Sequence, residues 1–244
     1  MRSRSMLGLA ATLCAFALTA APALAGPVFK ANEIGKEFTE AEPGKHRGVG
    51  RGVQDFKFGA FHIQCQSAKA KGLVGKEVSK TLFVSVKYKS CVALARVGNQ
   101  PITLKATFKT PWDFEYHANG FAEISGESES ELKIVKGGPI VMTVPSIKCT
   151  IEVPAQTVPL KAEKKPEAEY GDVTYATEEV PASGKHFPSG FQKQLVINNN
   201  LKKMEYELSE GQCETFKKTE GKNSSYTGTL VEQIKNGNLS EGPE

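Results

Sequence analysis

The sequence lacks any long apolar segment beyond its first 25 residues, which excludes a membrane protein built from several spanning helices. It also lacks a large excess of either charge, because 31 Lys and Arg residues face 27 Asp and Glu residues for a net charge of +4. This balance argues against a dedicated nucleic-acid-binding protein. With 39% hydrophobic and 24% charged residues, the 244-residue chain has the composition of a globular protein with a real core.

Motifs of the common catalytic classes are absent as well. The chain has no G-x-S-x-G, no H-E-x-x-H and no phosphate-binding P-loop, and its four histidines are scattered. These absences exclude the usual signatures of an α/β-hydrolase, a zinc protease and a nucleotide hydrolase. We expect no cofactor.

The first 25 residues have the layout of a secretory signal peptide. Arg2 and Arg4 precede an apolar stretch from residue 6 to residue 21, and Ala23-Leu24-Ala25 forms an A-x-A site before Gly26. The apolar stretch is shorter than the roughly 20 residues that a spanning helix needs, which disfavours a membrane anchor. We therefore predict a signal-peptide helix, cleavage between Ala25 and Gly26, and a mature chain without a membrane span.

Export leaves four cysteines in an oxidising compartment: Cys65, Cys91, Cys149 and Cys213. Four cysteines allow three pairings, and we favour Cys65–Cys91 with Cys149–Cys213 because each joins neighbours in sequence order. A zinc site of four cysteines is disfavoured because zinc ligands usually come in closely spaced pairs.

Alternation of apolar and polar residues dominates the chain from residue 54 onward. It recurs in 61–65, 81–88, 102–109, 147–153, 191–197, 203–208 and 227–231. Strands with one polar and one apolar face are typical of antiparallel sheets, so we expect an all-β fold, either an antiparallel β-sandwich or a distorted barrel. We assign residues 54–235 to this domain and leave open whether the charged segment 161–170 is a surface loop or a boundary between two subdomains.

The ends of the mature chain lack this alternation. Residues 26–53 are rich in Gly, Pro and charged residues, so they are predicted to form a flexible N-terminal arm. Residues 236–244 are polar and are predicted to form a disordered tail.

The cysteine-bearing strands resemble a group of exported proteins from high-GC Gram-positive bacteria. The resemblance rests on a strand ending in Cys65, a strand running into Ser90-Cys91, the segment Cys149-Thr150-Ile151-Glu152-Val153-Pro154-Ala155-Gln156, Cys213, and the closing segment 225–229. It covers about residues 55–232, although this chain lacks a further cysteine that the group has near Asn119-Gly120. The resemblance implies export, disulfides and β structure, and it implies no reaction.

The segment Trp112–His117 carries the candidate site residues. Alternation places Trp112, Phe114 and Tyr116 on one face of a strand, where they are either core residues or a stacking platform for sugar rings. It places three metal-competent side chains on the opposite face, namely Asp113, Glu115 and His117. A solvated edge strand is the simpler interpretation of that face.

We expect a secreted or cell-envelope protein that acts as a non-catalytic binding or structural module, with an envelope glycan or a protein as its partner. Nucleic acid is not an expected partner. The alternative is a secreted, glycan-directed hydrolase that uses Asp113 and Glu115 as its acid–base carboxylates. The third and least favoured hypothesis is a barrel that binds a small ligand in an apolar cavity.

Overall fold

The computed structural model describes residues 26–39, 41–59, 61–97, 100–118, 121–125, 139–158, 171–182, 190–209, 213 and 224–243. The strands are β1 (Pro27–Glu33), β2 (Gly44–Phe58), β3 (Phe61–Val74), β4 (Val78–Ser79), β5 (Thr81–Val97), β6 (Gln100–Phe108), β7 (Trp112–His117), β8 (Phe121–Ser125), β9 (Ile140–Val144), β10 (Cys149–Val153), β11 (Gln156–Val158), β12 (Asp172–Pro181), β13 (Phe191–Lys202), β14 (Glu207–Ser209), β15 (Ser225–Ile234) and β16 (Gly237–Pro243). A single 3₁₀ turn, η1 (Pro145–Ile147), separates β9 from β10. Within these ranges no helix is long and apolar enough to span a membrane.

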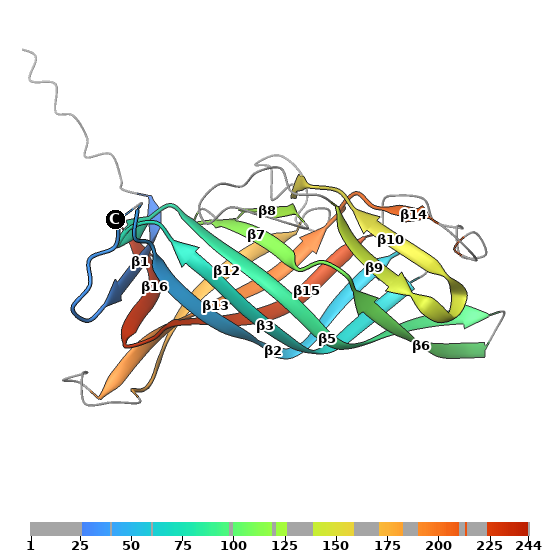
Figure 1. Ribbon diagram of the computed structural model, residues 1–244, viewed down its shortest axis with the longest axis horizontal. Helices are drawn as coiled ribbons and strands as arrows, with labels where there is room; N and C mark the ends of the chain where they lie inside the picture. The colour runs from blue at the N-terminus through green and yellow to red at the C-terminus, as the bar shows by residue number, and fades with distance from the viewer. Residues whose placement is uncertain are drawn as a thin grey trace, which may run out of the picture.

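The strands form two antiparallel sheets. The large sheet runs in the order β12-β13-β15-β2-β3-β5-β6-β9-β10-β14, with β7, β8 and β11 branching from β5. The small sheet has the order β16-β1-β4. The long strands of the large sheet run obliquely along the molecule, with the small sheet at one end and β9, β10 and β14 toward the other (Figure 1).

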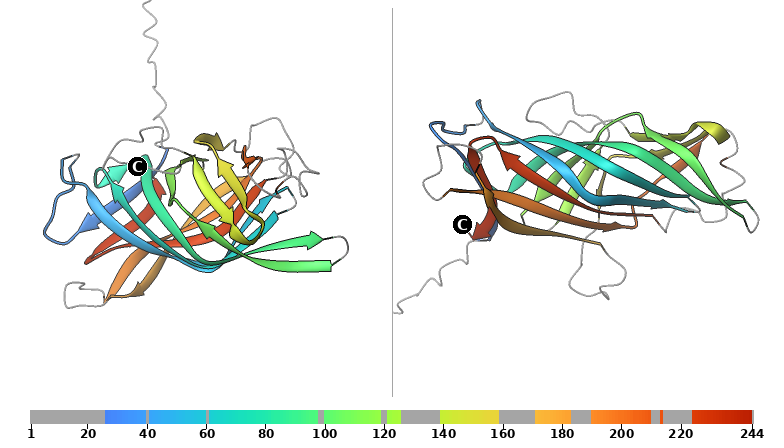
Figure 2. Two further views of the ribbon diagram at one scale, coloured as in Figure 1. Left: turned by 45° about the vertical axis from the view of Figure 1, so that its right-hand side comes forward. Right: turned by 90° about the horizontal axis from the view of Figure 1, so that it is seen from below.

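The large sheet curls around an aromatic core, and two further views show this curvature (Figure 2). Phe56 of β2 lies 4.6 Å from the ring of Tyr226 and 4.9 Å from that of Trp112, measured between ring centroids. The hydroxyl of Tyr116 in β7 donates to Asn199 Oδ1 in β13 at 2.9 Å, so these two parts of the sheet face each other across the core. The predicted all-β, antiparallel, sandwich-like fold is confirmed.

Both predicted disulfides are confirmed. Cys65–Cys91 joins residues that lie directly opposite each other in β3 and β5. Cys149–Cys213 ties the start of β10 to a residue 64 positions later in the chain.

Two expectations about the chain ends are wrong. Residues 26–53 are not a flexible arm, because they contain β1 and most of β2. Residues 236–244 are not a disordered tail, because 237–243 form β16 and pair with β1 over seven positions. Their polar composition reflects strands with one solvated face, and it does not prevent backbone pairing. The signal peptide (1–25) and the segment 161–170 lie outside the described residues.

A buried acid–base pair crosses the middle of the large sheet. Glu232 of β15 and His46 of β2 have fully buried side chains, and Glu232 Oε2 lies 2.8 Å from His46 Nδ1. The other ring nitrogen, Nε2, donates to the backbone carbonyl of Phe83 in β5 at 3.0 Å. Both ring nitrogens of His46 therefore have a hydrogen-bonding partner inside the sheet.

Two glycines make room for this pair. A Cβ on Gly48 would lie 2.1 Å from Glu232 Oε1, and a Cβ on Gly72 would lie 2.4 Å from the His46 ring and 1.9 Å from the Phe83 carbonyl oxygen. Gly48, which lies in the predicted flexible arm, therefore serves packing.

We expect Glu232→Ala to lower the free energy of unfolding by about 3–5 kcal/mol, because it leaves a buried imidazole without its partner. Glu232→Gln retains a side chain that can bond Nδ1, so it should cost less. Urea denaturation of both variants measures this, with Glu179→Ala on the exposed side of β12 as a control expected to change stability by under about 0.5 kcal/mol. Equal losses in Glu232→Ala and the control would contradict the role of the pair.

Candidate functional site

The most irregular part of the large sheet is a bulge in β2. Its pairing with β3 is interrupted between Val49 and Gln54, and its pairing with β15 shifts register between Thr227 and Thr229. Gly52 lies in the bulge with a φ of +72°, a backbone conformation that favours glycine. The bulge turns Gln54 into the core and leaves Arg51 and Val53 on the outside.

Two buried amide side chains occupy the space under the bulge. Gln54 donates to the Thr229 carbonyl at 3.1 Å and accepts from the Tyr226 hydroxyl at 2.8 Å. Asn199 donates to the Gly228 carbonyl at 3.3 Å, in addition to accepting from Tyr116. These amides bind backbone carbonyls beside the register shift, so the bulge is a rigid feature of the sheet.

Gly228 is required at this point. A Cβ there would lie 2.2 Å from Gln54 Oε1 and 2.9 Å from the Tyr226 hydroxyl. A side chain would therefore break the bond between Gln54 and Tyr226.

A polar groove of about 650 Å³ lies on the outer side of the bulge. Two rows of side chains cross the sheet here in register. Thr174, Asn198, Thr229 and Arg51 form one row, and Asp172, Asn200, Thr227 and Asp55 form the other. All eight residues line the groove, and they come from β12, β13, β15 and β2.

The side chains of the groove hold one another in place. Asn200 donates to Asp172 Oδ1 at 2.8 Å, and the Thr229 hydroxyl donates to Asn198 Oδ1 at 2.9 Å. Arg51 makes a bidentate ion pair with Glu178, in which the two terminal guanidinium nitrogens lie 2.8 and 2.7 Å from the two carboxylate oxygens. Hydrogen bonds from Arg51 and then from Gln194 lower the pKa of Glu178 from 4.5 to about 2.

The two aspartates of the groove are too far apart to act as a pair. Asp55 and Asp172 stand three strand intervals apart, about 14 Å at the usual strand spacing. Paired carboxylates of glycoside hydrolases are about 5–10 Å apart. Asp55 is also engaged by His62, whose Nε2 lies 2.6 Å from Asp55 Oδ1.

The three aromatic residues of the predicted candidate strand lie in the core. Trp112, Phe114 and Tyr116 are fully buried. The Phe114 and Tyr116 rings stack at 5.2 Å, and Trp112 lies 5.9 Å from Phe114. They offer no exposed surface to a sugar ring. Burial also raises the pKa of Tyr116 well above its usual value.

Asp113, Glu115 and His117 lie on the other face of β7, as the alternation predicts. β7 is not an edge strand, because it pairs with both β5 and β8. Asp113 is only 3% exposed, and His117 Nε2 lies 3.9 Å from Glu115 Oε1. Across the described residues no cluster of three or more His, Cys, Asp or Glu side chains is arranged to hold a metal ion.

The groove was missed by sequence reasoning because its residues come from four separate segments. Local signals were present in the run Asn198-Asn199-Asn200 and in the glycines at positions 48, 50 and 52. Neither signal specifies which strands are neighbours, and the groove depends on that pairing.

We expect Trp112 to fluoresce at short wavelength and to resist quenching by iodide, because its ring has no exposed surface. As the only Trp in the chain, it reports on this position alone. Emission at the wavelength of a solvated indole in the folded protein would contradict the burial.

We also expect Arg51→Gln to raise the pKa of Glu178 from about 2 toward 4.5, which an NMR titration of its carboxyl carbon measures. Because the folded-state pKa is depressed, the stabilisation from this ion pair is complete above pH 4.5 and is lost as the pH falls toward 2. Arg47→Gln removes the same charge from β2 and should leave the pKa of Glu178 at about 2. An unchanged pKa in Arg51→Gln would show that the ion pair does not form in solution.

Comparison of the chain with protein-family models, with curated proteins and with solved structures finds no match. The resemblance to exported proteins of high-GC Gram-positive bacteria stays a prediction. The geometry of the groove is therefore the basis for a functional proposal.

Proposed function

We propose that this protein is an exported, non-catalytic module that binds a hydroxyl-rich ligand, a glycan of the cell envelope, in the polar groove. The observation that carries the proposal is the groove itself, about 650 Å³ of space lined by amide, hydroxyl and charged side chains. These groups supply both hydrogen-bond donors and acceptors, which suits sugar hydroxyls because each hydroxyl both donates and accepts.

The rigidity of the groove supports this role. Its floor is the bulge held by Gln54 and Asn199, and its walls include Asn198 and Asn200, whose amides are already hydrogen-bonded to neighbours. A site built on strands with fixed side chains loses little conformational entropy when a ligand binds. A shallow groove across neighbouring strands also leaves space for a chain of sugars to continue past its ends.

Two features support export. The N-terminal segment has the pattern of a signal peptide, and the two disulfides are typical of proteins from oxidising compartments. A binding role without catalysis is favoured by the wide separation of Asp55 from Asp172 and by the close contact of Asp55 with His62.

Titration calorimetry with purified envelope glycans and defined oligosaccharides tests the proposal. We expect Asn198→Ala combined with Asn200→Ala to weaken binding by about tenfold or more, since each amide contributes hydrogen bonds worth about 0.5–1.5 kcal/mol. The matched control combines Gln66→Ala with Thr103→Ala, two exposed polar residues outside the groove, and it should bind as the parent protein does.

Absence of binding to any glycan would overturn the proposal. Equal loss in the groove variant and in the control would also overturn it, because the groove would then have no special part in recognition.

A further inference from the structure

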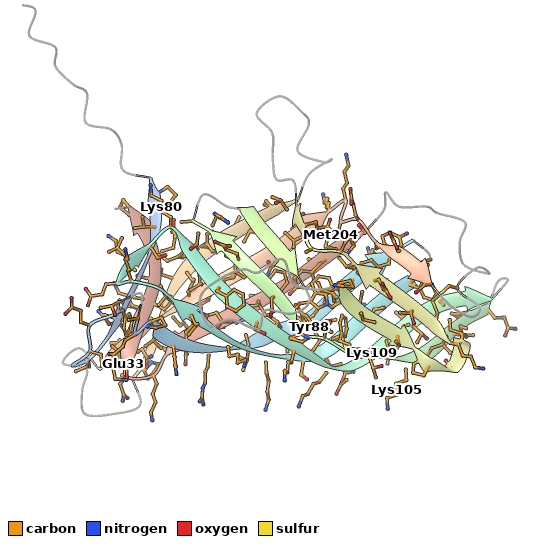
Figure 3. All side chains as sticks on the ribbon, turned by 45° about the horizontal axis from the view of Figure 1, so that its top comes forward. Glu33, Lys80, Tyr88, Lys105, Lys109 and Met204 are labelled. Atoms are coloured by element: carbon orange, nitrogen blue, oxygen red, sulfur yellow. A yellow bond between two sulfur atoms is a disulfide. The ribbon has the colours of Figure 1, made fainter. Side chains whose placement is uncertain are left out.

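Basic residues gather on the outer face of the large sheet although the chain as a whole is nearly neutral. The outward positions of β2, β3, β5 and β6 carry a group that we call the basic stripe, defined as Lys45, Arg47, Lys69, Lys71, Lys87, Lys89 and Lys105. All seven side chains are exposed. A row of nitrogen-tipped side chains projects from the lower side of the ribbon in Figure 3, with Lys105 labelled near one end.

Strand register makes the stripe a diagonal line. Arg47 lies opposite Lys71, and Lys69 lies opposite Lys87. Each of β2, β3 and β5 contributes two cations that are two residues apart: Lys45 and Arg47, Lys69 and Lys71, and Lys87 and Lys89. From each strand to the next, the pair is shifted along the strand direction by two residues. At usual strand spacings the stripe is about 30 Å long and one or two side chains wide.

This arrangement is costly to the folded protein. Like charges directly opposite each other destabilise a sheet, and the stripe contains two such pairs. In the part of the chain that the structure describes, none of the seven side chains forms an ion pair with an acid. Just outside the stripe, by contrast, Arg51 is neutralised by Glu178 and His62 is engaged by Asp55.

We propose that the basic stripe binds a linear acidic polysaccharide laid diagonally across the sheet. A line of positive charges about 30 Å long matches an extended polymer with acidic groups along its length. Six of the seven cations are Lys, which act as point charges without a fixed bonding geometry. This property suits a repeating polyanion held by its charge.

Two other anionic partners fit the stripe less well. Proteins that bind single-stranded nucleic acid stack bases on exposed aromatic rings, and Phe191 of β13 is the one aromatic residue among the large exposed apolar side chains of the described chain. Peripheral membrane proteins combine basic residues with apolar side chains that enter the bilayer, and on the stripe strands only Val49 and Val53 of β2 have this exposed character.

The stripe is separate from the polar groove, so the two surfaces can be tested independently. The probe is polygalacturonate, and its fully methyl-esterified form serves as an uncharged polymer of the same backbone. Binding of the purified protein is measured by calorimetry at low and at high salt. We expect binding to the charged form alone, with an affinity that falls steeply as salt rises.

The test variant combines Lys69→Gln, Lys71→Gln and Lys87→Gln, and it should bind polygalacturonate about 10- to 100-fold more weakly. The control combines Lys30→Gln, Lys80→Gln and Lys193→Gln, three exposed lysines outside the stripe. It changes the net charge by the same amount and should bind as the parent protein does. Circular dichroism is recorded to check that both variants are folded.

Equal weakening in both variants would overturn the proposal, because net charge would then explain the binding. Unweakened binding by the stripe variant would also overturn it. Tighter binding to a thymidine oligonucleotide or to anionic vesicles than to polygalacturonate would reassign the stripe to that partner. If the groove variant loses glycan binding while its salt-dependent binding to polygalacturonate is unchanged, the result bears on the groove alone. The two proposals can therefore fail independently of each other.

Discussion

The interruption of pairing in β2 is the constraint on which much of this structure depends. It directs Gln54 inward, where its amide bonds the Thr229 carbonyl and the Tyr226 hydroxyl, and it allows no side chain at Gly228. On the opposite side the same interruption leaves a hollow lined by Arg51 and Asp55. One irregularity of the backbone thus determines both a polar region inside the core and a polar groove on the surface.

β2 is held firmly on both sides of this interruption. On one side His46 bonds Glu232 of β15 and the carbonyl of Phe83, and on the other Phe56 packs among the rings of Tyr88, Trp112 and Tyr226. The disulfide between Cys65 and Cys91 fixes the neighbouring strands β3 and β5 at the level of Gln54, which pairs with Cys65. The bulge, with the polar groove on its outer side, therefore lies between well-ordered parts of the sheet.

Local alternation was sufficient to predict the class of fold and to place Trp112, Phe114 and Tyr116 on one face of β7, since both depend on residues close in sequence. It left open whether that face is core or a stacking platform, and their burial decides for the core. Cysteine order was sufficient to predict both disulfides. The polar groove and the basic stripe were not predictable, because each is assembled by register between distant segments: Asp172 and Asp55 are brought onto one row only by the pairing of four strands. Residues 44–53 were misassigned because their four glycines and two arginines are typical of a flexible basic arm, whereas Gly48 is required by the volume of the buried carboxylate of Glu232.

The pairing of β1 with β16 has a mechanical consequence. Pro27 lies opposite Pro243, so the two strands at the ends of the described chain leave the small sheet side by side. A pulling force applied between these positions would load the hydrogen bonds of this pair one after another, as in opening a zipper, and would not shear them all at once. The small sheet would yield at low force, while the long strands with their crosslinks would remain intact. Tension between Pro27 and Pro243 would therefore be relieved by release of β1 and β16 before it reached the polar groove or the basic stripe.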